Sequence, residues 1–192
     1  MLSEADIAYI RTNYRPLAEV CAEHGERLAV VEQLIRARRL PAPSYVLPDG
    51  TGMVPADYFA LVDEAGGVER LRGEFERRYR EAGGPPGELD ADWDGYIDGI
   101  YAVCLRSVSP ESIVRKEQLV VSVGLLLEQP QPDDAPWQER LAREVEELDA
   151  LEREFSPDYD RRRFGRPPTR DALIVAARER YPNLFAVGSH GR

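Results

Sequence analysis

The amino-acid sequence predicts a mainly α-helical fold, a compact multi-helix domain with one small β-hairpin near residues 45–54. Apolar residues recur at helical spacings of three and four along most of the chain. Proline or glycine marks the ends of these segments with unusual regularity. In residues 45–54, by contrast, two short apolar runs flank a Pro-Asp-Gly-Thr turn, which is typical of a hairpin.

Before the hairpin, three helices are predicted, over residues 4–13, 16–24 and 28–39. Ser3 and Asp6 have the spacing of a capping box at the start of the first helix. Pro16 suits the first turn of the second helix, and Gly25 suits its end.

The second and third predicted helices, followed by the hairpin, resemble a winged helix-turn-helix. In that arrangement the third helix would offer Arg36, Arg38 and Arg39 to DNA phosphates. Residues 1–40 hold six acidic and six basic side chains, however, whereas DNA binding needs a net basic face. A DNA-binding regulator is therefore an alternative, and nucleic acid is an unlikely partner.

After the hairpin, helices are predicted over residues 55–66, 68–81, 92–108, 110–127, 137–155 and 167–181. The glycine- and proline-rich segment 83–87 predicts a boundary between an N-terminal helical subdomain with the hairpin, 1–82, and a C-terminal helical subdomain, 83–192. One continuous domain is the alternative. The helix over 137–155 carries a single apolar stripe that would cover the core or dock a helix of a partner subunit.

Composition excludes several classes of protein. The N-terminus has neither the basic nor the apolar region of a signal peptide, so a cytoplasmic protein with two free cysteines is expected. The longest apolar stretch, residues 119–127, is far shorter than the about 20 residues of a membrane span. No membrane partner is expected. Of the 25 basic residues all are arginine except Lys116.

The net charge of −10 is unevenly distributed. Residues 1–82 carry −3, residues 83–150 carry −10 and residues 151–192 carry +3. The acidic middle segment repels phosphate backbones and favours a cationic substrate or partner. The alternative is that the basic C-terminal part packs beside it and partly neutralises it.

The most acidic stretch, residues 90–101, matches several positions of a calcium-binding loop. Its twelfth position is Tyr101, where the loop needs a bidentate glutamate, so no metal ion is predicted. On a helix, Asp90, Asp94, Asp98 and Tyr101 would share one face. Asp94 and Asp98 are then the candidate catalytic residues, as a general base or as the anchor for an ammonium group. A solvated acidic face has the same pattern.

The same segment supplies candidate substrate-binding residues. Trp93, Tyr96 and Tyr101 would form the walls of a site, and Arg106 or Arg115 would hold an anionic group. Cys104 has no histidine nearby in the sequence, which argues against a nucleophilic role. No cofactor is predicted.

Several motifs occur together in this chain: residues 45–50 with 54–59, then Trp93, Tyr96, Gly99, Tyr101 and Cys104, then Pro110-Glu111 and Arg115-Lys116. On these motifs the sequence resembles an actinobacterial family of uncharacterised proteins encoded in natural-product biosynthesis gene clusters. The resemblance implies a pathway context and no assigned catalytic residues.

From the candidate site residues and the family resemblance we expect a cofactor-independent enzyme, or a subunit of one, that acts on a small biosynthetic intermediate. Cyclisation by intramolecular displacement would need only positioning and one base. The alternatives are a non-catalytic helical partner, forming a homo- or hetero-oligomer through helical faces, and the DNA-binding regulator.

Overall fold

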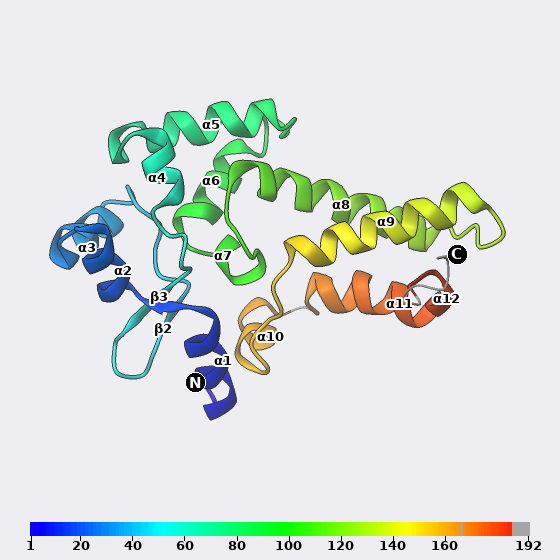
Figure 1. Ribbon diagram of the computed structural model, residues 1–192, viewed down its shortest axis with the longest axis horizontal. Helices are drawn as coiled ribbons and strands as arrows, with labels where there is room; N and C mark the ends of the chain where they lie inside the picture. Colours follow the sequence, from blue (N-terminus) through cyan, green and yellow to red (C-terminus); the bar gives the residue numbers. More distant parts are fainter. Residues whose placement is uncertain (166, 186–192) are drawn as a thin grey trace, which may run out of the picture.

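The computed structural model describes residues 1–165 and 167–185. It is mainly helical, with a small antiparallel sheet in its N-terminal part, and this confirms the predicted fold class. Figure 1 shows the α1–α3 region and the sheet at one end of the molecule and a long helical arm at the other. No helix within the described residues has the length and apolar character needed to cross a membrane.

The N-terminal part alternates helices and strands. It comprises α1 (Glu4–Asn13), β1 (Arg15–Pro16), α2 (Leu17–His24), α3 (Leu28–Arg36), β2 (Tyr45–Val46) and β3 (Gly52–Val54). The strands pair antiparallel in the order β1-β3-β2, with Arg15 opposite Val54 and Tyr45 opposite Met53. Both helix ends predicted from local signals are present: the Ser3–Asp6 capping box opens α1, and Gly25 closes α2 in the left-handed conformation.

The largest departure from prediction lies in the middle of the chain. It comprises α4 (Ala60–Ala65), η1 (Val68–Arg70), α5 (Leu71–Glu81), α6 (Leu89–Ile97) and α7 (Tyr101–Cys104). The single helix predicted over 92–108 is wrong, because Gly99 takes a left-handed conformation with φ 69° and separates α6 from α7. At this break the Ala42 amide donates to the Ile97 carbonyl, and a Cβ at position 99 would lie 2.3 Å from the Ala42 oxygen.

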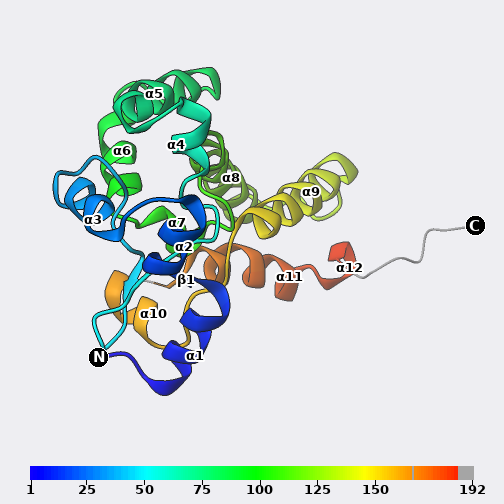
Figure 2. The ribbon, with the colours of Figure 1, turned by 60° about the vertical axis from the view of Figure 1, so that its left-hand side comes forward.

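The arm contains the C-terminal helices. Its elements are α8 (Pro110–Glu128), α9 (Ala135–Leu151), α10 (Tyr159–Phe164), η2 (Arg170–Val175), α11 (Ala176–Arg180) and α12 (Pro182–Phe185). Figures 1 and 2 show α8 and α9 as an antiparallel pair with η2 and α11 packed alongside, while α10 lies at the base of the arm near α1. The stripe of α9 predicted from Trp137 onward packs against α8 and against Ile174 and Ala177 of the last helices.

Smaller differences concern helix ends. α3 ends at Arg36 rather than at residue 39, and Arg38 beyond it adopts a φ of 55°. Residues 56–59 form turns before α4, and α9 ends at Leu151, ahead of Phe155. In each case the predicted helix was too long, and the residues beyond the true helix end bind distant parts of the chain, as Arg38, Tyr58 and Glu152 do.

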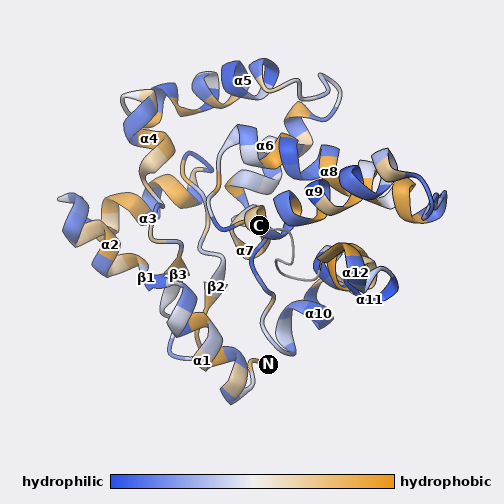
Figure 3. Ribbon diagram, turned by 45° about the vertical axis from the view of Figure 1, so that its right-hand side comes forward, coloured by the Kyte–Doolittle hydropathy of each residue, from blue (hydrophilic) through white to orange (hydrophobic). Residues whose placement is uncertain are grey.

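Three clusters of buried apolar residues hold the molecule together. The largest takes residues from Leu17 to Val114 and so includes both sides of the predicted boundary at residue 83. A second fills the arm between α8, α9 and α11, and a third joins α1, the sheet and Val103. The apolar positions of these helices appear as orange segments in Figure 3. The base of the arm, where the clusters meet, is where the candidate site lies.

Candidate functional site

A cleft of about 550 Å³ lies at the base of the arm. Three parts of the chain form it: the α6–α7 segment, one face of α8, and the segment from Phe155 to Thr169. The face of α8 consists of two pairs of residues at spacing four, Lys116 with Val120 and Glu117 with Val121. Ser109 and Pro110 fix the start of this helix through a capping box and a first-turn proline.

Asp92 is the centre of a buried carboxyl–phenol cluster beside the cleft. It is only 4% exposed, and it accepts a hydrogen bond from Tyr79 Oη at 2.5 Å and another from Tyr101 Oη. Tyr101 reaches Asp92 because its ring lies over Gly95, where a Cβ would be 2.8 Å from a ring carbon. Burial, followed by the bond to Asp92, raises the pKa of both phenols, so both remain protonated donors.

Glu117 lines the cleft next to this cluster and has an unusual proton affinity. Burial, the charge of Asp92 and a hydrogen bond with Asp92 raise the pKa of Glu117 to about 7. A neighbouring negative charge disfavours the ionised form of a carboxyl group. Near neutral pH Glu117 can therefore give or accept a proton at the wall of the cleft.

Lys116 provides a cation on the same wall. Its Nζ donates a hydrogen bond to Cys104 Sγ at 3.1 Å and lies 3.5 Å from Oε1 of Glu152. The side chains of Lys116 and Glu152 are 13% and 3% exposed. Burial lowers the pKa of Lys116, but Cys104 and Glu152 outweigh it and the net shift is upward. Burial raises the pKa of the Cys104 thiol, with Lys116 acting against it.

Backbone contacts between α7 and the end of α9 bring Cys104 and Glu152 together. Leu105 and Glu152 form an isolated antiparallel bridge. The Arg153 amide donates to the Cys104 carbonyl at 2.8 Å, and the Arg106 amide donates to the Leu151 carbonyl at 3.0 Å. Within the described residues, Glu152 Oε1 has no hydrogen-bond partner.

The rest of the cleft is mostly apolar. Its other lining residues are Gly95, Ile100, Val120, Val121, Phe155, Phe164, Pro167, Pro168 and Thr169. A site with a small polar group and an apolar wall is the usual form of a small-molecule pocket, and about 300–1,000 Å³ is the usual size. In the described part of the chain, no cluster of three or more His, Cys, Asp or Glu side chains is arranged to hold a metal ion.

Of the residues predicted from the sequence, Asp94 and Asp98 lie outside this cleft. Both carboxylates are about half exposed and bind the same guanidinium: Arg38 Nη2 is 2.7 Å from Asp94 and Arg38 Nη1 is 2.6 Å from Asp98. The predicted face with Tyr101 does not form, because the break at Gly99 turns Tyr101 toward Asp92 instead. Their catalytic role stays a prediction.

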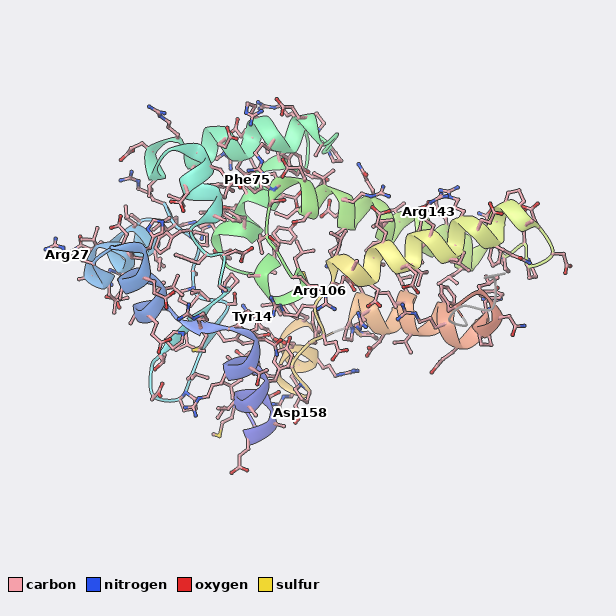
Figure 4. All side chains as sticks on the ribbon, in the orientation of Figure 1. Tyr14, Arg27, Phe75, Arg106, Arg143 and Asp158 are labelled. Carbon is pink, nitrogen blue, oxygen red and sulfur yellow. The ribbon has the colours of Figure 1, made fainter. Side chains whose placement is uncertain are left out.

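The other predicted residues are dispersed. Trp93 and Tyr96 pack in an aromatic group with Phe75, and Tyr96 is only 5% exposed. Arg115 forms an ion pair with Glu147 at 2.5 Å on the arm. Arg106 is exposed and appears in Figure 4 near the junction of α7 and α9. Of the seven predicted residues, only Tyr101 lines the cleft.

The arginines expected to face DNA are in ion pairs. Arg36 lies 3.9 Å from Glu32, Arg39 contacts Glu69, and Arg38 binds the two aspartates described above. Arg27 projects from the outer end of the α2–α3 region in Figure 4. The acidic middle segment thus neutralises part of the surface that the helix-turn-helix would use.

One feature of the sequence indicates the cleft. Lys116 is the only lysine in a chain with 25 basic residues, so an amine stands at one position where the chain otherwise uses guanidinium groups. No sequence spacing indicates the Asp92–Glu117 pair, since it joins two helices.

Comparisons with known proteins bear on the same region. No curated protein and no solved structure gave a significant match. One family model matches residues 74–182, a range that includes Tyr79, Asp92, Lys116, Glu117 and Glu152 and leaves out the sheet and α1–α4. The match covers more than half of the 192 residues, and the chain therefore belongs to the family of unknown function DUF6058.

Proposed function

We propose that this protein is a cofactor-independent enzyme that acts on a small intermediate of natural-product biosynthesis, with its site in the cleft at the base of the arm. The observation that carries the proposal is the Asp92–Glu117 pair. It places a carboxyl group with a pKa of about 7 on the wall of a cleft of about 550 Å³. The biosynthetic context rests on the family resemblance of the sequence.

Glu117 is suited to general acid–base catalysis. A proton carrier works best when its pKa is near the working pH, because it is then present in both protonation states. Burial and, after it, the charge of Asp92 raise that pKa, and Tyr79 and Tyr101 hold Asp92 in place through two hydrogen bonds. Glu117 is thus the proposed catalytic residue, and Asp92 is a positioning residue that acts through it.

Lys116 and the apolar wall would bind the substrate. The ammonium group attracts an anionic or carbonyl oxygen, and the phenylalanine and proline side chains exclude water from the reacting groups. Cyclisation by intramolecular displacement, the reaction that the biosynthetic context suggests, needs one base and a fixed geometry, and Glu117 can supply that base.

A complementation experiment tests the proposal. The gene is deleted from its native strain, and small-molecule extracts are compared by mass spectrometry after complementation with the wild type, Glu117→Gln or Glu139→Gln. Glu139 is an exposed residue of α9 away from the cleft, so its variant is a matched control. We expect deletion to accumulate an intermediate that the wild type and the control convert and Glu117→Gln does not. Full conversion by Glu117→Gln would overturn the proposal.

The same strain tests the site predicted from the sequence. Asp94→Asn and Asp98→Asn remove carboxylates that the cleft does not use, so the proposal expects both variants to convert the intermediate. Loss of conversion in these variants, with conversion retained by Glu117→Gln, would place the site beside Arg38 instead.

One observation favours a second candidate, a DNA-binding regulator. The order helix, strand, helix, helix, strand, strand and the sheet order β1-β3-β2 suit a winged helix-turn-helix. A gel shift with DNA from the gene's own upstream region, at moderate salt, tests it. Retarded bands that survive competition by unrelated DNA would support the regulator, and the ion-paired state of Arg36, Arg38 and Arg39 leads us to expect none.

A further inference from the structure

We propose that Lys116 is a covalent anchor for carbonyl substrates, its amine forming a protonated imine with an aldehyde or ketone bound in the cleft. This inference rests on the proposed function and names the substrate class of the same site.

Residue 116 is the one lysine of the chain. All other basic residues of the chain are arginine, so a positive charge alone could have been supplied by the residue that the chain uses everywhere else. Lysine differs from arginine in that it can lose its proton and act as a nucleophile, whereas a guanidinium stays charged. A lone lysine on the wall of a cleft therefore points to chemistry of the amine.

The side chain of Lys116 lies at the boundary between the protein interior and the cleft. Nζ of Lys116 is largely buried yet belongs to a side chain that lines the cleft, so a small molecule there can reach it while bulk water is mostly excluded. It lies 3.5 Å from Oε1 of Glu152, a buried oxygen that makes no hydrogen bond in the described residues. That oxygen is a ready acceptor for the proton that the ammonium must lose.

The steps balance with groups of this chain. The Lys116 ammonium gives one proton to the Glu152 carboxylate, and the free amine adds to the carbonyl carbon while protonated Glu117 gives a proton to the carbonyl oxygen. The nitrogen of the resulting carbinolamine returns one proton to Glu117, and the hydroxyl leaves as water with the proton from Glu152, which leaves the protonated imine. In sum, one ammonium and one carbonyl give one protonated imine and one water, and Glu117 and Glu152 return to their starting protonation states.

The site acts on the first step in two directions. The charges of Cys104 and Glu152 raise the pKa of Lys116 against the effect of burial, but burial also raises the pKa of Glu152. Lys116, which donates the proton, and Glu152, which accepts it, are thus adjacent, and both are largely buried. A bound carbonyl group that replaces the thiol contact would remove one of the interactions that keep the amine protonated.

Reductive trapping tests the inference on the full chain. The protein is incubated with sodium cyanoborohydride and, in separate samples, glyoxylate, pyruvate, acetaldehyde or cyclohexanone, and adducts are located by peptide mass spectrometry. Arg143→Lys places a second lysine on the exposed surface of the arm, far from the cleft, and serves as the matched control within the same folded chain (Figure 4).

We expect at least one probe to label Lys116 faster than the amine introduced by Arg143→Lys, by roughly 100-fold, the size of effect that general acid–base catalysis supplies. Lys116→Arg should abolish this label, and Glu117→Gln should slow it toward the rate of the control amine. Equal or slower labelling of Lys116 with all four probes would overturn the inference.

The two proposals fail separately. If Glu117→Gln abolishes conversion of the intermediate but Lys116 traps no probe, the proposed function stands and the carbonyl anchor is wrong. If Lys116 is labelled selectively and Glu117→Gln changes neither labelling nor conversion, the anchor stands and the acid–base role of Glu117 is wrong.

Discussion

The Nζ atom of Lys116 lies between Cys104 Sγ, at 3.1 Å, and Glu152 Oε1, at 3.5 Å. The three side chains come from α8, α7 and the residue that follows α9. This contact therefore joins the arm to the rest of the molecule at the same place where it forms the wall of the cleft, so stability and function are coupled there.

The Lys116–Glu152 pair gives the first prediction. Lys116→Met leaves the buried Glu152 carboxylate without its cation, which we expect to cost about 3–5 kcal/mol in the free energy of unfolding. In the double variant Lys116→Met with Glu152→Gln, most of that loss should be recovered, because no uncompensated charge remains. Urea unfolding of the wild type, both single variants and the double variant measures the coupling. Strictly additive losses would contradict it.

Glu117 predicts how stability depends on pH. Its pKa is raised from 4.5 to about 7, so the folded chain binds the proton more tightly than the unfolded chain does. The stability that this group contributes is fully present below about pH 4.5 and is lost as the pH rises through about 7.

Glu117→Gln should remove this contribution, and the variant should therefore lose less stability than the wild type as the pH rises from about 4.5 to about 7. Urea unfolding at a series of pH values measures it, and Glu139→Gln should follow the wild type. Parallel curves for the wild type and Glu117→Gln would show that the carboxyl group has an ordinary pKa.

How far the sequence predicts this molecule depends on whether a feature is local. The capping box of Ser3 and Asp6 and the helix end at Gly25 were predictable, because neighbouring residues satisfy the backbone groups there. The break at Gly99 was not. The apolar spacing continues through it, and what opens the helix is the backbone of Ala42, 57 residues earlier in the chain.

The candidate site shows the same limit. Its helix was identified because acidic and aromatic residues crowd into it, and Tyr101 is the residue that the prediction and the cleft share. The partners that decide the chemistry come from α8 and from the end of α9. No spacing in the sequence indicates that Glu117 meets Asp92, or that Arg38 reaches across 56 residues to engage Asp94.

Asp6 gives a prediction about the N-terminal attachment. It is fully buried, and its Oδ1 accepts the backbone amides of Asp158 and Tyr159 at the start of α10, both at 3.0 Å. Figure 4 shows Asp158 beside α1. The Oδ2 atom of Asp6 accepts hydrogen bonds from the amide and the hydroxyl of Ser3. Asp6→Ala leaves these donors unsatisfied and should cost about 3 kcal/mol in urea unfolding.

Glu4→Gln is the matched control for Asp6, since Glu4 is an exposed acid in the same first turn of α1. Burial alone would raise the pKa of Asp6. The hydrogen bonds to Ser3, Asp158 and Tyr159 outweigh burial and lower this pKa below its usual 3.8. The stability it contributes is therefore present above pH 3.8 and is lost as the pH falls below that value. A loss in Asp6→Ala no larger than that in Glu4→Gln would contradict the prediction.

The last prediction separates structure from function at Asp94 and Asp98. Their ion pairs with Arg38 are exposed, with side chains that are 46–63% accessible. Exposed pairs contribute little, because water and salt screen them and two long side chains lose freedom. Asp94→Asn and Asp98→Asn should each change the free energy of unfolding by less than about 1 kcal/mol, and salt should shrink the difference further.

That small effect makes the two variants a clean test of chemistry. If they fold as stably as the wild type and still convert the intermediate, Asp94 and Asp98 belong to a solvated surface and only bind Arg38. If they fold normally and lose conversion, the carboxylates contact the substrate, and the row predicted from the sequence is the site. A larger loss of stability would instead show that Arg38, with its φ of 55°, depends on both carboxylates to hold the end of α3 in place.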